Sequence, residues 1–421
     1  MRSKVHDIWQ KLNPSGFVFR YYLATFFSGL MFYVSVLVPF YTEWGHLNLT
    51  QVQFLQSWLM IWMFVLNIPT GALADHLGRK VSVSLGGFIL AISSVVYVLI
   101  PNFYLFLFAE FLAALGTSFV VGASSALVYD YLKRSGRDNE SKKVLARSSS
   151  FSNLGTIVAA PVGSLIAAQF GLRAPMIISA IPLFIAAIVI LTVDEPKTQK
   201  VFSRHDLINT SKMGISILLK NKTVLYLIAS DILVWIGAYF LIWLYQPMLV
   251  KVGLAIIYFG FIRSAFSLAA TAATFNIHIT ERIFGSEKNF VNLTAIIVSA
   301  TLIFIAIYPS VVTVVIAIIL VGGLASTRSS FMNTTMNEFI PAEQRATILS
   351  ATSTLKTLVF AIANPMVGFA ADHSLRLTFL LIGFLPLIAF FLLPYSLKLK
   401  EHLPKTEPLA GQPEPKIVGV I

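Results

Sequence analysis

The stretch PTGALADHLGRKVSV, Pro69–Val83, interrupts two long apolar runs and sets two glycines, an aspartate, an arginine and a lysine close together. Gly71 and Gly78 permit a close helix approach and a tight turn with unusual φ. Asp75 suits the N-terminal cap of the following helix, and the basic pair suits contacts with acidic groups nearby. A well-made helical hairpin explains the glycines and the charges separately, but it does not explain why they occur together.

The composition is that of a protein that spans a membrane many times. Of 421 residues, 57% are hydrophobic and only 12% are charged, against about 25% charged residues in ordinary soluble domains. A net charge of +12 would suggest nucleic acid as the partner of a soluble protein. Here the basic residues lie in short loops between apolar runs, so we expect a lipid bilayer and no nucleic acid. The absence of cysteine excludes disulfides, thiolate catalysis and cysteine-ligated metals.

Apolar runs of sufficient length predict twelve membrane-spanning helices, because a bilayer core of about 30 Å needs roughly 20 apolar residues per helix. The predicted spans are 17–41, 50–74, 80–100, 103–132, 145–170, 173–193, 223–250, 254–281, 289–308, 311–337, 346–371 and 375–394. The chain then divides into an N-terminal six-helix bundle, 1–193, a cytoplasmic linker, 194–222, a C-terminal six-helix bundle, 223–397, and a disordered cytoplasmic tail, 398–421. Spaced apolar residues in the linker fit either an interfacial helix or an irregular segment.

The distribution of basic residues predicts the orientation of these spans. With the N-terminus in the cytoplasm, only Arg173, Lys251 and Arg376 fall in loops on the opposite side, and most of the other lysines and arginines lie inside. This is the bias known for cytoplasmic loops. We therefore expect both termini in the cytoplasm and a location in a bacterial inner membrane.

The two halves resemble each other weakly. Aligning Gly116 with Gly323 brings Asp130 opposite Asn337, and a second match pairs Pro161 with Pro365. Either match alone is weak, but the two lie in corresponding places. They favour a duplicated six-helix unit, an architecture in which substrate sites lie between the repeats.

The loop GALADHLGRK resembles the signature loop of the major facilitator superfamily of secondary transporters, Gly-x-Leu-Ala-Asp-x-x-Gly-Arg-Lys. The resemblance implies two six-helix bundles that rock around a midplane site, with this loop locking the cytoplasmic side when the protein faces outward. Further stretches, among them SSALVYDYLK and WLYQPML, are similar to a group of bacterial members of mostly unassigned substrate. The residues expected to form the conformational latch are Gly71, Asp75, Gly78, Arg79, Lys80 and Asp130.

Charged residues within spans are costly and are therefore functional candidates. Arg263 and Lys356 lie near the predicted midplane and are expected to bind substrate, while Arg328 either does the same or bridges helices. Glu110 and Asp231 are the candidates for proton coupling, with static buried pairs as the alternative. The deep aromatic residues expected to line the substrate cavity are Trp62, Trp235 and Tyr239.

The sequence as a whole predicts a secondary active transporter that moves a small solute by alternating access, coupled to protons. The deep charges sum to a small positive value, which favours an organic anion or zwitterion. A multidrug/proton antiporter exporting lipophilic compounds is the alternative, and a receptor without transport is a second one. We expect no enzymatic activity, no cofactor, no metal site and a monomer. No Gly-x-x-x-x-Gly-Lys-Ser/Thr loop for ATP is present in the sequence.

Overall fold

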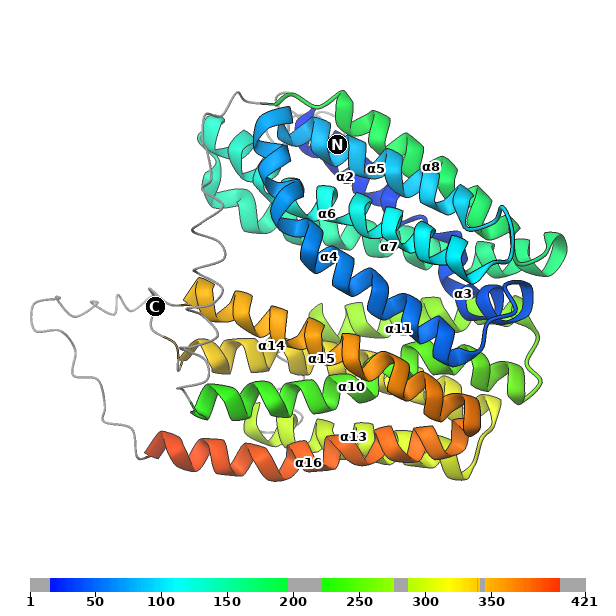
Figure 1. The fold of residues 1–421 in the computed structure, drawn as a ribbon. Coiled ribbons are helices and arrows are strands. Elements are labelled where there is room, and N and C mark those ends of the chain that lie inside the picture. The colour runs from blue at the N-terminus through cyan, green and yellow to red at the C-terminus, as the bar shows by residue number, and fades with distance from the viewer. Residues whose placement is uncertain (1–15, 196–221, 276–286, 339, 341–344, 402–421) are drawn as a thin grey trace, which may run out of the picture.

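A computed structural model describes residues 16–195, 222–275, 287–338, 340 and 345–401. Over these residues the chain consists of helices joined by short loops (Figure 1). Eleven helices are long and apolar enough to cross a membrane, and the shorter apolar helix Leu375–Phe391 follows them. The predicted all-α fold of two six-helix bundles is confirmed.

The N-terminal bundle contains the first six spans. Its elements are α2 (Phe17–Gly29), η1 (Phe32–Ser35), α3 (Leu37–Pro39), η2 (Phe40–Trp44), α4 (Leu49–Leu77), α5 (Arg79–Val96), α6 (Phe103–Arg134), η3 (Asp138–Glu140), α7 (Ser141–Phe170) and α8 (Ala174–Leu191). Asn48 begins α4 with a capping box, since its side chain accepts the Gln51 N–H and the Gln51 side chain accepts the Asn48 N–H.

The C-terminal bundle contains the second six spans. Its elements are α10 (Lys222–Lys251), η4 (Ile256–Tyr258), α11 (Phe259–Phe275), α13 (Glu287–Ile307), α14 (Val311–Glu338), α15 (Arg345–His373) and α16 (Leu375–Glu401). α16 continues past residue 397, where the sequence predicts the start of the tail. Most of the linker, the rest of the tail and the predicted end of the eighth span lie outside the described residues.

The first predicted span, 17–41, was wrong in one respect, because it is not one continuous helix. α2 ends at Gly29, and the chain continues through η1, α3 and the π-helical η2. Side chains of other helices bind the backbone groups freed by the break: Ser179 accepts the Phe32 N–H at 3.0 Å, and Thr156 donates to the Gly29 carbonyl at 3.1 Å. Non-helical backbone at membrane depth requires such internal partners.

Close packing against α7 explains the break. A Cβ atom added at Gly163 would collide with the carbonyl of Phe32, and one added at Gly155 would lie 2.5 Å from the carbonyl oxygen of Phe26. Glycines on α7 thus let the backbone of the first span press directly against it. The approach depends on residues more than a hundred positions away, so the apolar run alone does not reveal it.

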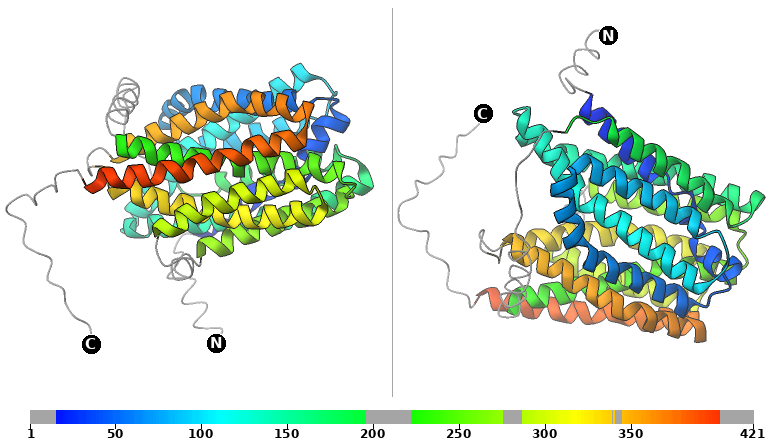
Figure 2. Two further views of the ribbon diagram at one scale, coloured as in Figure 1. Left: turned by 90° about the horizontal axis from the view of Figure 1, so that it is seen from below. Right: turned by 45° about the horizontal axis from the view of Figure 1, so that its top comes forward.

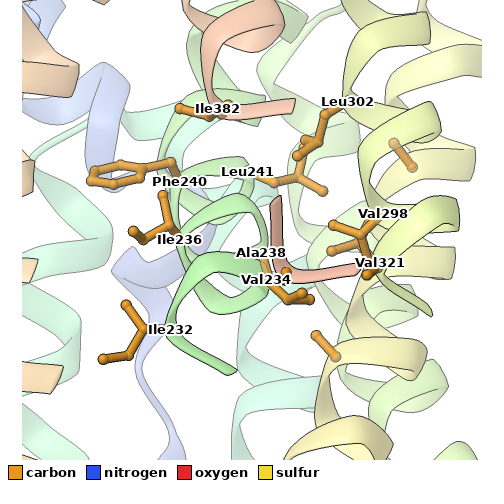
Figure 3. Close-up of a cluster of buried hydrophobic side chains, with 14 of the residues drawn as sticks. Ile232, Val234, Ile236, Ala238, Phe240, Leu241, Val298, Leu302, Val321 and Ile382 are labelled. Atoms are coloured by element: carbon orange, nitrogen blue, oxygen red, sulfur yellow. The ribbon is translucent and has the colours of Figure 1, made fainter. Parts of the chain in front are cut away.

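The hydrophobic cores differ between the bundles. One large cluster centres on α10 and includes residues of α13, α14 and α16 (Figure 3). Phe240, Leu241, Val298 and Leu302 in this cluster are fully buried. The N-terminal bundle has two separate clusters instead, one around Phe17 and Leu127 and the other around Phe40 and Phe106.

The bundles meet along two helix pairs, α4 with α15 and α7 with α11. They lie close together at one end of the molecule and diverge toward the left in Figure 1 and in the right view of Figure 2. We call the diverging end, which carries Arg79, Lys80 and Arg134, the basic end, and the other the closed end.

Candidate functional site

At the closed end, a carboxylate of one bundle caps a helix of the other. Asp372, near the end of α15, accepts the N–H groups of Leu49 and Thr50 at 2.7 and 2.9 Å and the Thr50 hydroxyl at 2.5 Å. These donors form the first turn of α4, where the helix dipole favours a negative charge. Gly368 lies so close that an added Cβ would be 2.6 Å from the Leu49 carbonyl oxygen. The contact fastens α15 to α4.

A second set of hydrogen bonds joins the bundles on the same side. Gln246 of α10 accepts the Val38 N–H at 3.0 Å and donates to the Val34 carbonyl at 3.1 Å, so it binds the broken part of the first span. Between α7 and the start of the second bundle's α11, Ser264 donates to the Ile157 carbonyl at 2.6 Å. These hydrogen bonds between uncharged groups join the two bundles from the closed end toward the middle of the molecule.

At the basic end, the motif loop binds within its own bundle. Arg79 forms an ion pair with Asp130 of α6, and its backbone N–H donates to Glu195. Gly78 has φ +94°, and a Cβ there would lie 2.8 Å from Glu195 Oε2, so only glycine fits. Lys80 donates to the Val193 carbonyl at 3.3 Å. Of the predicted latch residues, Arg79 and Asp130 are therefore in direct contact.

The other motif residues have open surroundings. A Cβ added at Gly71 would meet no atom within 4 Å. The side chain of Asp75 makes no hydrogen bond or ion pair with the described residues, although Asp75 lies on the helix, α4, that contacts the second bundle. The expectation that Asp75 caps the following helix is therefore wrong, since the N-cap residue of α5 is Gly78 and no side chain caps it.

A hexapeptide pattern, Gly-x-x-Ala-Asp-His, occurs at the end of both α4 and α15, as GALADH at 71–76 and GFAADH at 368–373. Both helices have 29 residues, and they pack antiparallel. The copy in α15 is docked on the first turn of α4. The copy in α4 points toward the basic end, where the bundles diverge. The α4–α15 pair thus carries the same sequence segment at each end, and the copy in α15 is docked.

Two of the predicted charged residues of the second bundle are in contact inside it. Lys356 Nζ of α15 and Asp231 Oδ2 of α10 are 2.5 Å apart. Asp231 is fully buried and its Oδ1 has no hydrogen-bond partner among the described residues, whereas the side chain of Lys356 is 23% exposed. The structure therefore brings two predicted site residues together, and the lysine keeps one accessible side.

Arg328 is enclosed rather than exposed. Its side chain is 1% exposed and donates to the Thr294 hydroxyl and the Ser230 hydroxyl, both at 3.0 Å, and to the Val291 carbonyl. Ser230 precedes Asp231, so the guanidinium also lies near that carboxylate. This position favours the helix-bridging alternative over a substrate contact.

Arg263 lies on α11, next to the residue that bonds across the seam to α7. Its Nη1 donates to the Ser267 hydroxyl at 2.7 Å, and its guanidinium carbon is 5.0 Å from the centre of the Phe266 ring. Within the described ranges no carboxylate lies within 4.0 Å of it. Among the described residues its side chain thus contacts an aromatic face and a hydroxyl rather than a carboxylate.

Polar groups lacking partners gather where α10, α15 and α4 meet. The Tyr239 hydroxyl lies near Asn364 and Trp243, yet it has no hydrogen bond with proper geometry to the described chain. Asn364 Oδ1 and both side-chain amide atoms of Gln53 are also buried, and they have no hydrogen-bond partner in the described part of the chain. Buried polar groups normally find partners, so this cluster is the best candidate for contact with a polar solute.

The two predicted tryptophans have different surroundings. Trp62 packs edge-on against Phe111, with 4.8 Å between the ring centres. The indole N–H of Trp62 is buried and has no partner in the described structure. Trp235 is half-buried and lies against the large core of the second bundle. Asp231, Trp235 and Tyr239 are spaced four residues apart on α10, so the three side chains lie on the same face of this helix.

Glu110 occupies a separate site inside the N-terminal bundle. Its side chain is 97% buried, and Oε1 accepts the Tyr41 hydroxyl at 2.8 Å and the Gln56 amide at 3.4 Å. Tyr33 and Tyr97 line the same cavity of about 190 Å³. Over the described residues, no basic side chain lies within 4.0 Å of the carboxylate. The carboxyl group therefore sits in a cage of hydroxyl and amide groups.

Sequence reasoning missed the neutral amides and one acid. It weighed charges inside spans but passed over Gln53, Gln56, Gln246 and Asn364, although a side-chain amide inside an apolar span is itself a signal. It also passed over Asp372, because a carboxylate at a predicted helix end reads as an ordinary solvated residue. Its role depends on a helix start more than 300 residues earlier in the chain.

The family sequence model described as Major Facilitator Superfamily matches residues 21–364 of this chain. None of the curated proteins compared with the chain matches it. Among solved structures, a bacterial homologue of the human lysosomal transporter Spinster, in an inward-facing and occupied conformation, is 16% identical with a TM-score of 0.71, over 92% of this chain and 97% of that one. The nucleoside transporter NupG is 15% identical with a TM-score of 0.72, over 91% and 99%. A POT family transporter in complex with 5-aminolevulinic acid is 12% identical with a TM-score of 0.72, over 90% and 96%.

These identities show a common fold and nothing about the solute. Together with the helical architecture and the motif loop, the family match defines the class of protein as a multi-pass membrane transporter rather than an enzyme. The chain belongs to the major facilitator superfamily of secondary transporters.

Proposed function

We propose that this protein moves a small organic anion or zwitterion across the bacterial inner membrane by alternating access, in exchange for or together with protons. The basic end faces the cytoplasm, and the protein works as a monomer. The observation that carries the proposal is the docking of one Gly-x-x-Ala-Asp-His segment, 368–373, at the closed end, while its counterpart at 71–76 is undocked.

The antiparallel geometry of α4 and α15 makes the two ends equivalent. In the opposite state Asp75 caps the first turn of α15, as Asp372 caps α4 here, and Gly71 allows the same close approach. The ion pair of Arg79 with Asp130 keeps the motif loop in position for this contact. Closing one end therefore releases the other, which is the requirement of alternating access.

The solute site is formed by Lys356, Tyr239 and Asn364, with Arg263, Trp62 and Trp235 as further contacts. Lys356 is held by Asp231 at 2.5 Å, so a solute carboxylate competes with Asp231 for the ammonium group. A proton on Asp231 neutralises the competitor and frees Lys356 for the solute. Binding of an anion and of a proton are then linked, and the buried site stays close to neutral.

Export of lipophilic cations is the alternative function. It is favoured by Glu110, a buried carboxyl group surrounded by tyrosine rings, since such a site suits an ammonium or a delocalised cation. In this case Lys356 and Asp231 form only a structural pair.

The test is a thermal-shift screen of the purified protein against organic anions, zwitterions and lipophilic cations, followed by flux in proteoliposomes. A ligand that binds only the folded state raises the melting temperature. Stabilisation by anions that disappears in Lys356→Met, with flux driven by a pH gradient, supports the proposal. Stabilisation by cations that requires Glu110 instead supports the alternative, and ligand binding without flux by the wild-type protein contradicts both.

A further inference from the structure

Two cavities lie behind the first span, inside the N-terminal bundle. One, of about 190 Å³, contains Glu110, and the other, of about 210 Å³, lies nearer the basic end. Four residues line both cavities: Met31, Leu90, Thr117 and Leu183. The two spaces therefore adjoin, and they meet beside the break in the first span.

One face of α6 runs along both cavities. Glu110 lines the first, Thr117 lines both, and Ser124 lines the second. Seven residues are close to two helical turns, so these three side chains point in the same direction. Each is polar, although the surrounding helix is strongly apolar.

Further hydroxyl groups continue the polar lining toward the basic end. Thr25 and Ser28 of the first span face the second cavity, and the Tyr21 hydroxyl is 2.6 Å from Ser124 Oγ. A water molecule needs about 30 Å³ and two to four polar partners. Both cavities have the volume for several water molecules, and Glu110, Thr117, Ser124, Thr25 and Ser28 provide polar partners within linings that are otherwise mostly apolar.

Packed aromatic rings separate Glu110 from the closed end. Phe106 lies one turn before Glu110 on α6 and is fully buried, with its ring 5.6 Å from that of Tyr41 and 6.0 Å from those of Phe40 and Trp44. Tyr41 itself is 1% exposed. From Glu110 the cavities therefore continue along Thr117 to Tyr21 and Ser124, and the buried cluster around Phe17 and Leu127 packs between this point and the basic end.

We propose that a file of water and hydroxyl groups along Glu110, Thr117 and Ser124 delivers protons to Glu110 from the basic end, through the interior of the N-terminal bundle. A hydronium ion at the basic end gives up its proton, successive waters pass a proton on, and the last transfer forms an O–H bond on the Glu110 carboxylate. Protons thus reach Glu110 by a route separate from the solute site between the bundles. The use of these protons in transport rests on the proposed function. The existence of the path does not, and it can be tested without measuring transport.

The cysteine-free chain allows a direct test by single cysteines. Ser94→Cys places a thiol in the first cavity, and Ser124→Cys places one in the second. Ag⁺, a small ion that does not cross membranes, is applied to right-side-out and inverted vesicles in nitrate buffer. Blocked thiols are then counted by maleimide labelling after denaturation. The matched control is Ile181→Cys, on the outer apolar groove of α8, where a thiol meets lipid rather than water.

We expect Ag⁺ to block both cavity cysteines from the basic-end side and to react with the control about tenfold more slowly, because only a hydrated thiol ionises readily. We expect Thr117→Leu, which replaces the polar residue shared by both cavities with a larger apolar one, to slow the reaction of Ser94→Cys with Ag⁺ and to leave the reaction of Ser124→Cys unchanged. Reaction of Ser94→Cys only from the other side, no reaction at all, or indifference to Thr117→Leu overturns the path. Size-exclusion profiles and melting temperatures exclude misfolded variants. A labelled path combined with unchanged proton-coupled flux in Glu110→Gln would show that the path supplies no coupling proton, and it would leave the path itself and the proton on Asp231 of the proposed function in place.

Discussion

At the scale of single residues, the Lys356–Asp231 pair ties a buried carboxylate to a partly exposed ammonium. The sequence alone predicts that Lys356→Ala loses substrate binding more than stability. The geometry changes that expectation, because Lys356→Ala takes the ion-pair partner from the fully buried Asp231 carboxylate, and removing one partner of a buried pair costs up to about 3–5 kcal/mol. We therefore expect Lys356→Ala to lower the melting temperature clearly.

The double variant Lys356→Ala/Asp231→Asn is the control, since it removes both charges and should recover most of the lost stability. Thermal unfolding of the purified proteins measures both effects. A melting temperature unchanged in the single variant would mean that the pair contributes nothing to stability and that Lys356 is held for solute alone.

The pair of Arg137 and Glu140 behaves differently, because it lies in the loop at the basic end. Two hydrogen bonds of 2.8 and 2.7 Å join the guanidinium to the carboxylate and hold the pKa of Glu140 below its usual value. A lowered pKa adds stability above the carboxyl's unfolded pKa, and that stability is lost as the pH falls through the folded value. Since the pair is solvated, it is worth at most about 1 kcal/mol.

We therefore expect Arg137→Ala to unfold at a slightly lower temperature than the wild type at neutral pH, and we expect the difference to shrink as the pH falls below the unfolded pKa of the carboxyl group. Melting curves at several pH values measure this. A difference that grows in acid would contradict the assignment.

At the scale of elements, α4 and α15 carry the same Gly-x-x-Ala-Asp-His segment at opposite ends, and Asp372 of one copy is docked on the first turn of α4. A carboxylate at a helix N-terminus contributes about 0.3–1 kcal/mol when exposed and up to about 2 kcal/mol when partly buried. We expect Asp372→Asn to shift the population toward the state open at the closed end, by about fivefold per kcal/mol lost. Asp75→Asn should shift it the opposite way and impair flux without unfolding the protein.

Distances between spin labels on single cysteines, one in each bundle at the basic end, measure these populations. Asp372→Asn should raise the population with the short distance at the basic end, and Asp75→Asn should lower that population. Equal distributions in both variants and the wild type, or unchanged flux in Asp75→Asn, would show that the helix pair is not the latch.

At the scale of the whole molecule, transport requires the closed end to open. The side chains of Thr50 and Asp372 touch across the two bundles, with 2.5 Å between Oγ1 and Oδ2. We expect a disulfide in Thr50→Cys/Asp372→Cys to hold the closed end shut and to abolish flux in proteoliposomes. Reduction should restore activity to the level of the unoxidised double variant, and each single variant under oxidant is the control. Full flux with the disulfide in place would contradict a mechanism in which the bundles rock.

The sequence predicted the elements of the fold well and the site only in part. Apolar length located the described spans within a few residues, and the motif loop by itself indicated the family. Arg79 with Asp130, and Lys356 with Asp231, were singled out separately, and each pair is in contact. The break in the first span was not predicted, although α2 ends at Gly29 and Pro39 follows within the same span. It results from glycines of α7 pressing against it.

Hydrophobic length, loop charge and the motif by themselves determined that this chain crosses the membrane as two six-helix bundles of a transporter, because each is a local property read along the chain. Only the tertiary structure decided which charges meet and which end is shut. The ion pair of Lys356, the enclosure of Arg328, the cavities beside Glu110 and the docking of Asp372 on α4 all join residues distant in sequence. Their energies depend on burial and separation, and these exist only once the helices have packed.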